Sequence, residues 1–365
     1  QKELQQLVEA ERAQLRLDIA EAAAKAYVLV LQAKTNERVE RENLHRTRSN
    51  LELARVREAV GYSGRADVYR WESEIATNRS RLITANSQRN VTEIQLNRLL
   101  HQPAEKPFVP SEIELSNDEL LQRQGPMIRY LESQGLFRKL RNFLAQEGLL
   151  HAPELQQLEA FIRAQKYLLA NAKRAFWTPT VALQADIENT FWKSDAGQNG
   201  ANPLPIPGLT TADDPSWTVA LNLRFPLFTS GAKTADKKQA EAELAQLELQ
   251  RQATAEKIEQ RIRTALHRAG ASFAAIRLSE DAARAATQNL ELVVDAYSRG
   301  VLSIIDLIDA QNAALVAEQA SANAVYTFII DFVEAQRAVG LFRYFMNEQE
   351  RAQILLRLEA FVDDQ

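Results

Sequence analysis

Two aspartates, Asp306 and Asp309, have the spacing in this chain that most directly suggests chemistry. They lie three residues apart, just after a short turn and at the start of a helical pattern. Residues at this spacing share one face of a helix, and a ring of such carboxylates would attract cations and disfavour anions. The alternative is that both are solvated residues at a helix start that interact with the helix dipole.

The sequence shows no set of residues that forms an enzyme site. Its four histidines are scattered: His45, His101, His151 and His267. It has no phosphate-binding loop, zinc motif or nucleophile elbow. It also has no cysteine for a disulfide or a thiolate metal site. We therefore expect no enzymatic activity, no cofactor and no metal.

Composition excludes another class of partner. The 365 residues include 44 Lys and Arg against 48 Asp and Glu, a net charge of -4, so we expect no nucleic-acid binding. Only 12 Gly and 11 Pro are present and they cluster, which favours long uninterrupted helices. The longest apolar stretches, such as residues 326–333, are too short for a transmembrane helix.

An internal repeat determines the architecture that we expect. Residues 287–311 repeat residues 48–72 without a gap: Gly300 matches Gly61 and Asp306 matches Asp67. Each copy is a long helical pattern, a turn that contains the glycine, and a second helical pattern. We expect helices over residues 1–60, 67–100, 232–298 and 304–339, which form two antiparallel coiled-coil hairpins. Alanines spaced by three and four residues indicate close helix packing: Ala310, Ala313, Ala317, Ala320 and Ala324.

Between the repeats the apolar period changes from 3.6 to 2, which predicts two strands. Each has about the 9 to 11 residues that cross a bilayer at a tilt, and aromatic residues gather at the ends. A soluble hairpin with one buried face is the alternative. For the membrane strands we expect one set of side chains to face lipid: Val181, Leu183, Ile187, Val219, Leu221 and Leu223. We expect a second set to face water: Gln184, Asp186, Asn222 and Arg224.

One hairpin cannot close a barrel, and an open sheet edge is not stable in lipid. The repeat predicts a sister hairpin ahead of Gln1. Four strands per full protomer and three protomers would give a 12-stranded transmembrane β-barrel continuous with a helical α-barrel.

The fold class that we expect is mainly α with a β-hairpin, and the chain divides into six segments. Residues 1–101 are the first helical hairpin and residues 231–341 the second. Between them we expect an inter-repeat equatorial module at 102–150, with short helices near 117–123 and 126–146. A helix at 151–177 leads to the barrel, and the transmembrane β-hairpin with its long external loop follows at 178–230. The last segment, 342–365, is a C-terminal equatorial helix.

Three segments resemble the TolC-type outer-membrane efflux proteins. Pro226-Leu227-Phe228-Thr229-Ser230-Gly231 resembles the Pro-Leu-Phe-x-Gly-Gly joint between strand and helix in that family. Residues 296–300 and 304–310 resemble the second helix-turn-helix. Residues 151–155 resemble the start of the inter-repeat helix, with His151 in place of an arginine. The resemblance covers nearly the whole chain.

The resemblance implies a homotrimeric channel-tunnel in the cell outer membrane that extends into the periplasm. Such a protein contacts outer-membrane lipid and is a passive conduit for efflux or type I secretion. An inner-membrane pump feeds it through a periplasmic adaptor, the membrane fusion protein. The alternative is a periplasmic coiled-coil adaptor or scaffold without channel activity, but an adaptor would carry one helical hairpin flanked by small β modules.

The resemblance also implies roles for residues at the turns. Asp306 and Asp309 match the paired aspartates that ring the periplasmic aperture. Asp67 and Tyr297 match the pair that links neighbouring hairpins when the tunnel is shut. Leu302 and Ala66 replace the arginine and the hydroxyl residue of a second link. Arg65 and Arg299 are the candidates to substitute for that arginine.

The turns themselves would form the tips that meet the adaptor, through Gly61, Gly64, Gly300, Val301 and Ser303. Glycine at positions 61 and 300 fits a sharp helix end with positive φ. In the alternative interpretation these glycines only turn the chain.

Overall fold

The computed structural model describes residues 2–109, 129–131, 133–188, 216–225, 228–342 and 346–363. The chain divides into two compact units. The first is formed by residues 1–160 and 251–365, and the second by residues 161–250.

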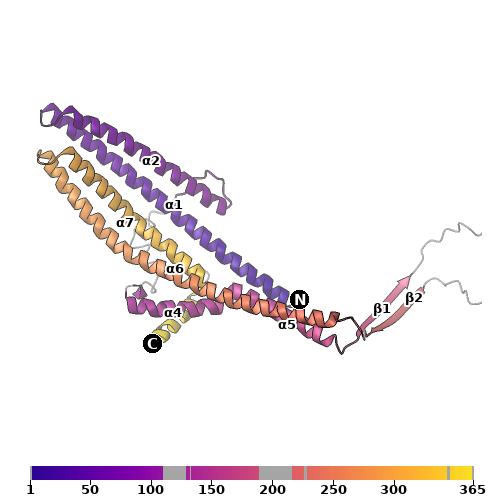
Figure 1. The fold of residues 1–365 in the computed structure, drawn as a ribbon. Coiled ribbons are helices and arrows are strands. Elements are labelled where there is room, and N and C mark those ends of the chain that lie inside the picture. Colours follow the sequence, from indigo (N-terminus) through magenta and orange to yellow (C-terminus); the bar gives the residue numbers. More distant parts are fainter. Residues whose placement is uncertain are drawn as a thin grey trace, which may run out of the picture. The chain divides into compact units, whose positions relative to one another are not determined.

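Two helical hairpins make up most of the first unit. The first hairpin consists of α1 (Lys2–Ala59) and α2 (Arg65–Leu99). The second consists of α6 (Ala232–Ser298), which begins in the other unit, and α7 (Ile304–Val339). Both turns lie at the same end of the bundle, and α1 packs against both α2 and α7 (Figure 1). The predicted fold of long antiparallel helices is confirmed.

Apolar side chains hold α1, α6 and α7 together along their length. Leu31 of α1 and Val325 and Phe328 of α7 are almost fully buried in one cluster, to which Ile276 of α6 also belongs. Burying a side chain of this size contributes about 1.5–3 kcal/mol. The face of α7 that packs inside this chain includes Ala310 and Ala314.

The predicted alanine seam is therefore only partly used within one chain. Ala310 is buried, whereas Ala313 and Ala320 are exposed. The buried face of α7 also includes larger side chains such as Leu315, Val325 and Phe328. The exposed alanines do not lie on this face.

A hydrogen-bonded cluster is buried between the two hairpins. Gln311 of α7 donates to Asn43 Oδ1 (3.0 Å) and to Thr47 Oγ1 (2.6 Å) of α1. Asn78 of α2 donates to the same Thr47 hydroxyl (2.9 Å), and Asn50 donates to Gln311 Oε1 (2.8 Å). The cluster therefore connects α2, α1 and α7 through polar side chains, of which Asn43, Thr47, Asn78 and Gln311 are buried.

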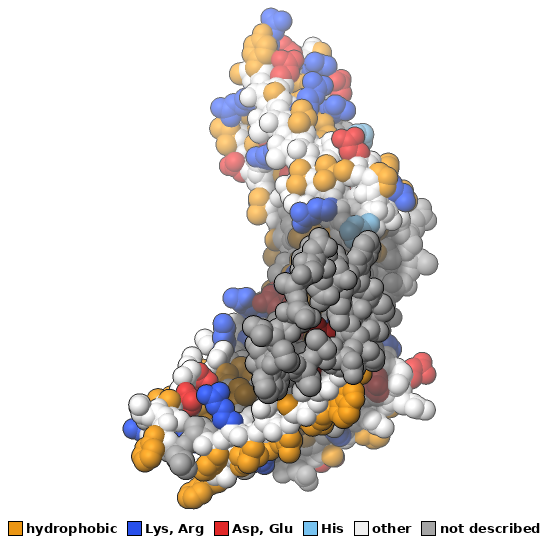
Figure 2. All heavy atoms as spheres, turned by 90° about the vertical axis from the view of Figure 1, so that its right-hand side faces the viewer, with side chains coloured by type: hydrophobic (Ala, Val, Ile, Leu, Met, Phe, Trp, Pro, Cys, Tyr) orange, Lys and Arg blue, Asp and Glu red, His pale blue; other side chains and the backbone are white. Residues whose placement is uncertain are grey.

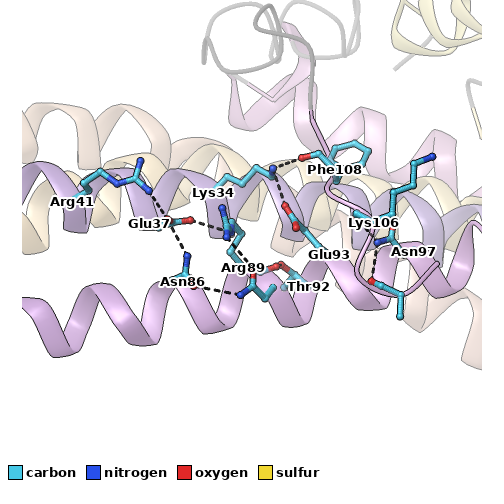
Figure 3. Close-up of polar contacts among 12 residues, drawn as sticks. Lys34, Glu37, Arg41, Asn86, Arg89, Thr92, Glu93, Asn97, Lys106 and Phe108 are labelled. Carbon is cyan, nitrogen blue, oxygen red and sulfur yellow. Dashed lines mark hydrogen bonds and ion pairs between the residues drawn. The ribbon is translucent and has the colours of Figure 1, made fainter. Parts of the chain in front are cut away.

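The chain that follows α2 folds back onto the first hairpin (Figure 3). Asn97, which is buried, donates to the carbonyl of Lys106 (2.8 Å). Lys34 of α1 forms an ion pair with Glu93 of α2 (2.8 Å) and donates to the carbonyl of Phe108. These contacts fix the first residues of the inter-repeat segment against the hairpin.

Shorter helices complete the helical part: α4 (Gln134–His151), α5 (Pro153–Arg174) and α8 (Glu348–Asp363). The helix expected near 126–146 was misplaced at both ends. Residues 110–128, including the helix expected near 117–123, lie outside the described residues. Ser133 is extended (φ -119°, ψ 131°), so α4 begins only at Gln134. It then continues beyond 146 and ends at His151. It ends there because Ala152 precedes Pro153, and the residue before a proline disfavours the helical conformation.

The second unit contains the predicted β-hairpin, β1 (Thr180–Glu188) paired antiparallel with β2 (Ser216–Arg224). The register places Val181 opposite Leu223 and Leu183 opposite Leu221. Directly opposed residues point to the same face, so the apolar side chains of both strands form one surface. Figure 2 shows a row of hydrophobic side chains where this hairpin points toward the viewer.

The polar residues form the other face of the hairpin. Gln184 donates to Asp186 Oδ2 (2.8 Å) on this face, and Arg224 pairs across with Thr180. The predicted sorting of side chains onto two faces is confirmed. Residues 189–215, which include Phe191, Trp192 and the predicted external loop, lie outside the described residues.

Candidate functional site

The helix ends at the two turns use glycine in similar ways. Gly61 (φ 82°) and Gly300 (φ 79°) have positive φ, as expected from their positions after α1 and α6. Gly64 differs, because it is extended (φ -90°) and precedes α2 as its N-cap residue. The turns also expose large apolar side chains, with Tyr62 80% and Val301 74% exposed.

Asp306 forms part of a capping box at the start of α7. Its carboxylate accepts from the Ser303 backbone N–H (2.9 Å) and the Ser303 hydroxyl (2.6 Å), and its own N–H donates to Ser303 Oγ (3.4 Å). The Ser303 hydroxyl and backbone N–H lower the pKa of the Asp306 carboxyl. The carboxylate therefore keeps its charge to lower pH than an ordinary aspartate.

Asp309 lies one turn further along α7 and is exposed, as is Asp306. The spacing leaves both carboxylates on the same side of the helix. The interpretation of a helix-start residue fits Asp306, whose side chain caps α7. This role is compatible with a charged ring, because capping also keeps the carboxylate ionised.

Tyr297 is buried where the two hairpin tips meet (1% exposed). The Arg57 guanidinium of α1 stacks over its ring, with Cζ 4.3 Å from the ring centroid. Trp71 of α2 is fully buried in the same cluster, together with Leu307 of α7. All four long helices therefore contribute side chains to one tip cluster.

Asp67 lies close enough to Tyr297 to affect its ionisation. Burial raises the pKa of the Tyr297 phenol, and the Asp67 carboxylate raises it further, while Trp71 and Arg57 act in the opposite direction. The Trp71 indole N–H lies near the phenol oxygen but does not reach hydrogen-bonding geometry. The structure thus brings Asp67 and Tyr297 together within one chain.

Arg57 was not among the residues that the sequence suggested for this site. The two expected substitutes, Arg65 and Arg299, remain on their own hairpins. Arg299 forms an ion pair with Asp295, and Arg65 lies 3.9 Å from Glu58. Arg57 sits one turn before Gly61 in an ordinary helical pattern, so no local signal distinguishes it from other arginines of α1.

The joint between β2 and α6 has an unusual backbone. Ser230 (φ 50°) and Gly231 (φ 85°) both have positive φ immediately before α6. Phe228 is 96% exposed. Pro226 and Leu227 lie outside the described residues.

Neither a metal centre nor a spanning helix is found in the described part of the chain. No group of three His, Cys, Asp or Glu side chains there could hold a metal ion. None of the helices described combines the length and the apolar character needed to cross a membrane.

Two long helical hairpins combined with an amphipathic β-hairpin define the class of fold to which this chain belongs. Residues 144–341 match the family of outer membrane efflux proteins. The match covers more than half of the chain, and the chain belongs to this family.

Curated relatives agree with this assignment. The chain is 28% identical over 132 residues to outer membrane protein TolC of Salmonella enteritidis and 26% identical over 160 residues to that of Escherichia coli strain K12. These segments cover 36% and 43% of the chain, but only 26% and 31% of the relatives' own length.

Solved structures share the fold over most of the chain. A membrane protein from Pseudomonas aeruginosa has a TM-score of 0.71 and 19% identity, and the match covers 92% of this chain and 71% of that one. The open state of the MtrE outer membrane channel of Neisseria gonorrhoeae has a TM-score of 0.69 and 19% identity, and covers 92% and 68%. At this identity the likeness shows the fold alone.

Proposed function

We propose that the chain forms part of an outer-membrane channel-tunnel, a passive export conduit across the periplasm and outer membrane that serves a tripartite efflux or type I secretion system. The exposed apolar face of the β-hairpin is the observation that carries this proposal. Trp217, Leu221 and Leu223 are each at least 67% exposed on one face. In a soluble hairpin such a face would be covered.

The assembly that we propose is a homotrimer whose barrel contacts outer-membrane lipid. Two strands expose unpaired edges, so strands from further hairpins must close the sheet within lipid. The exposed alanines of α7, Ala313 and Ala320, are small enough to allow a neighbouring helix to approach closely.

The two tips are the proposed contact for a periplasmic adaptor and its inner-membrane pump. Val60, Tyr62 and Val301 are all more than 60% exposed at the turns. Exposed apolar side chains gathered at one end of a long bundle suit contact with another protein.

At the tips we propose a gate with two components. Asp306 and Asp309 from three chains would place six carboxylates around one axis and favour cations. The stacking of Arg57 on Tyr297 would hold the two hairpins of each chain together in the shut state.

Conductance of the intact protein that carries this chain, measured in planar bilayers, tests the proposal. Stable channels should appear, and Asp309→Asn should shift the reversal potential in asymmetric salt toward weaker cation selectivity. Glu291→Gln, which removes one exposed carboxylate from α6, is the matched control. A protein that acts only as an adaptor would give no conductance. An unchanged reversal potential in Asp309→Asn would contradict the proposed role of the aspartates in ion selectivity.

A further inference from the structure

Positive charge concentrates on both helical segments that flank the β-hairpin. Residues 161–179 contain four Lys or Arg and no Asp or Glu, and residues 228–240 contain three Lys and one Asp. The whole chain is negative, with a net charge of -4. Beyond these segments the sign reverses, since residues 241–256 contain four Glu and one Arg.

The structure places the two basic segments at the same level. The end of α5 and the start of α6 run antiparallel up to the hairpin (Figure 1). Gln165 of α5 donates to Glu243 Oε2 (2.8 Å) and to the carbonyl of Ala240 (3.4 Å) of α6. Residues after 165 on α5 and before 240 on α6 therefore lie between this contact and the strands.

Five side chains in this region form what we name the basic collar: Lys173, Arg174, Lys233, Lys237 and Lys238. Lys173, Arg174 and Lys238 are exposed and have no acidic partner within 4.0 Å among the described residues. Lys237 lies 3.7 Å from Glu241 in a half-exposed pair, which is weak in water.

Aromatic side chains accompany the collar. Trp177 is 86% exposed and Phe228 is 96% exposed at the two chain segments that enter the hairpin. Lys233 Nζ lies 5.3 Å from the centroid of the Phe225 ring. Exposed aromatic rings beside lysines with long apolar stems are typical of the boundary between lipid and water.

We propose that the basic collar binds the phosphate groups of anionic phospholipids at the periplasmic boundary of the membrane. This inference rests on the proposed function, because it requires the apolar face of the hairpin to lie in lipid. On α5 the collar ends at Arg174, six residues before β1 begins, and on α6 it occupies the first seven residues, about 10 Å of helix axis. That distance brings the cations near headgroups, where attraction persists over roughly a Debye length of 8 Å.

Charge complementarity favours a lipid surface over a protein partner. In the sequence the collar residues lie just before β1 and just after β2, and the excess of positive charge ends at about residue 240, farther from the hairpin. Anionic headgroups lie directly beside an inserted hairpin and carry the opposite charge.

Lipid retention by the intact protein tests the collar. The protein would be reconstituted in vesicles of phosphatidylcholine and phosphatidylglycerol at three to one, re-extracted, and analysed by native mass spectrometry. We expect several-fold enrichment of phosphatidylglycerol over its bulk ratio. In the wild type this enrichment should decrease as the salt concentration rises. A variant that replaces all five collar residues with Gln should show no enrichment at any salt concentration.

The control neutralises an equal number of exposed cations away from the hairpin: Arg48→Gln, Arg70→Gln, Arg79→Gln, Lys257→Gln and Arg277→Gln. It should keep the enrichment. Insertion of the wild type without enrichment, or equal loss in the collar and control variants, would overturn the collar. If the collar variant kept its lipids but changed ion selectivity, the collar would face the lumen and the inference would also fail. A wild type that does not insert at all would instead contradict the proposed function.

Discussion

At the scale of single residues, the Arg57 side chain of α1 stacks on the ring of Tyr297 of α6 at the hairpin tips. Arg57 is buried, and its Nε and Nη1 atoms have no hydrogen-bond partner among the described residues. The aromatic ring 4.3 Å away is then the main compensation for burying this charge. Such a contact couples α1 to α6 directly.

We expect a double-mutant cycle of Arg57→Met and Tyr297→Leu to give a coupling free energy of about 0.5–2 kcal/mol in unfolding experiments. The physical reason is that each single change already removes the stacked pair. Arg55→Met is the control, because Arg55 has only half-exposed partners, including Glu72 at 3.5 Å. Additive effects for Arg57 and Tyr297 would show that the stack contributes nothing.

The capping box gives a prediction about pH. Because the folded pKa of Asp306 lies below its unfolded value, its contribution to stability is complete above the ordinary carboxyl pKa of about 4 and is lost as the pH falls through the lowered value. Ser303→Ala removes the hydroxyl that causes most of this shift. The difference in melting temperature between wild type and Ser303→Ala should be largest near neutral pH and should shrink below about pH 4.

Ser298→Ala is the matched control, because the Ser298 hydroxyl donates to the uncharged carbonyl of Asp295 (2.7 Å). Its effect on melting temperature should not change over the same pH range. A Ser303→Ala difference that stayed constant with pH would mean that Asp306 is not the linked group.

At the scale of helices, the buried polar cluster fixes the two hairpins in register. Gln311 is 4% exposed and bonds three residues of α1. Sliding α7 along α1 would break all of these bonds at once, while apolar contacts could re-form. A polar cluster of this kind therefore specifies one alignment of the helices.

We expect Gln311→Leu to lower the free energy of unfolding by about 2–4 kcal/mol, because it leaves several buried polar groups without partners. Denaturant titration would measure the loss. Gln252→Leu is the control: Gln252 is exposed and its side chain donates to Glu256 (3.1 Å), also exposed, so its effect should stay within about 0.5 kcal/mol. Equal effects of the two substitutions would exclude a role for the cluster in stability.

At the scale of the whole molecule, the proposed function makes the β-hairpin the part of the chain that enters the membrane. Leu221 and Asn222 are neighbours on β2 but point to opposite faces. Arginine on a lipid face near the midplane costs about 2–4 kcal/mol per chain, whereas the face toward water tolerates it. This difference allows a comparison between adjacent positions.

Leu221→Arg in the intact protein should therefore reduce the amount of folded oligomer in the membrane fraction, and Asn222→Arg should leave it nearly unchanged. Semi-native gel electrophoresis of membrane extracts would measure both. The opposite ranking would reverse the assignment of the two faces.

Much of the architecture could be predicted from sequence because it depends on local periodicity. The second hairpin was expected over residues 232–298 and 304–339, and α6 and α7 have those bounds. The strands followed from alternation, since a period of two fixes which side chains share a face. The capping box could also have been found, because a serine three residues before Asp306 is a recognised signal. The domain boundaries remain predictions.

What only the tertiary structure decided is which side chains meet between elements. Arg57, Arg65 and Arg299 are alike as residues near a turn, yet only Arg57 stacks on Tyr297. Likewise, Gln311 resembles any polar residue of α7 until α1 places Asn43 and Thr47 beside it. The sequence by itself determined the helices, the turns and the two faces of the hairpin, because these depend on neighbours within one or two turns. Contacts between hairpins depend on how two long helices align, and helical periodicity does not encode that alignment.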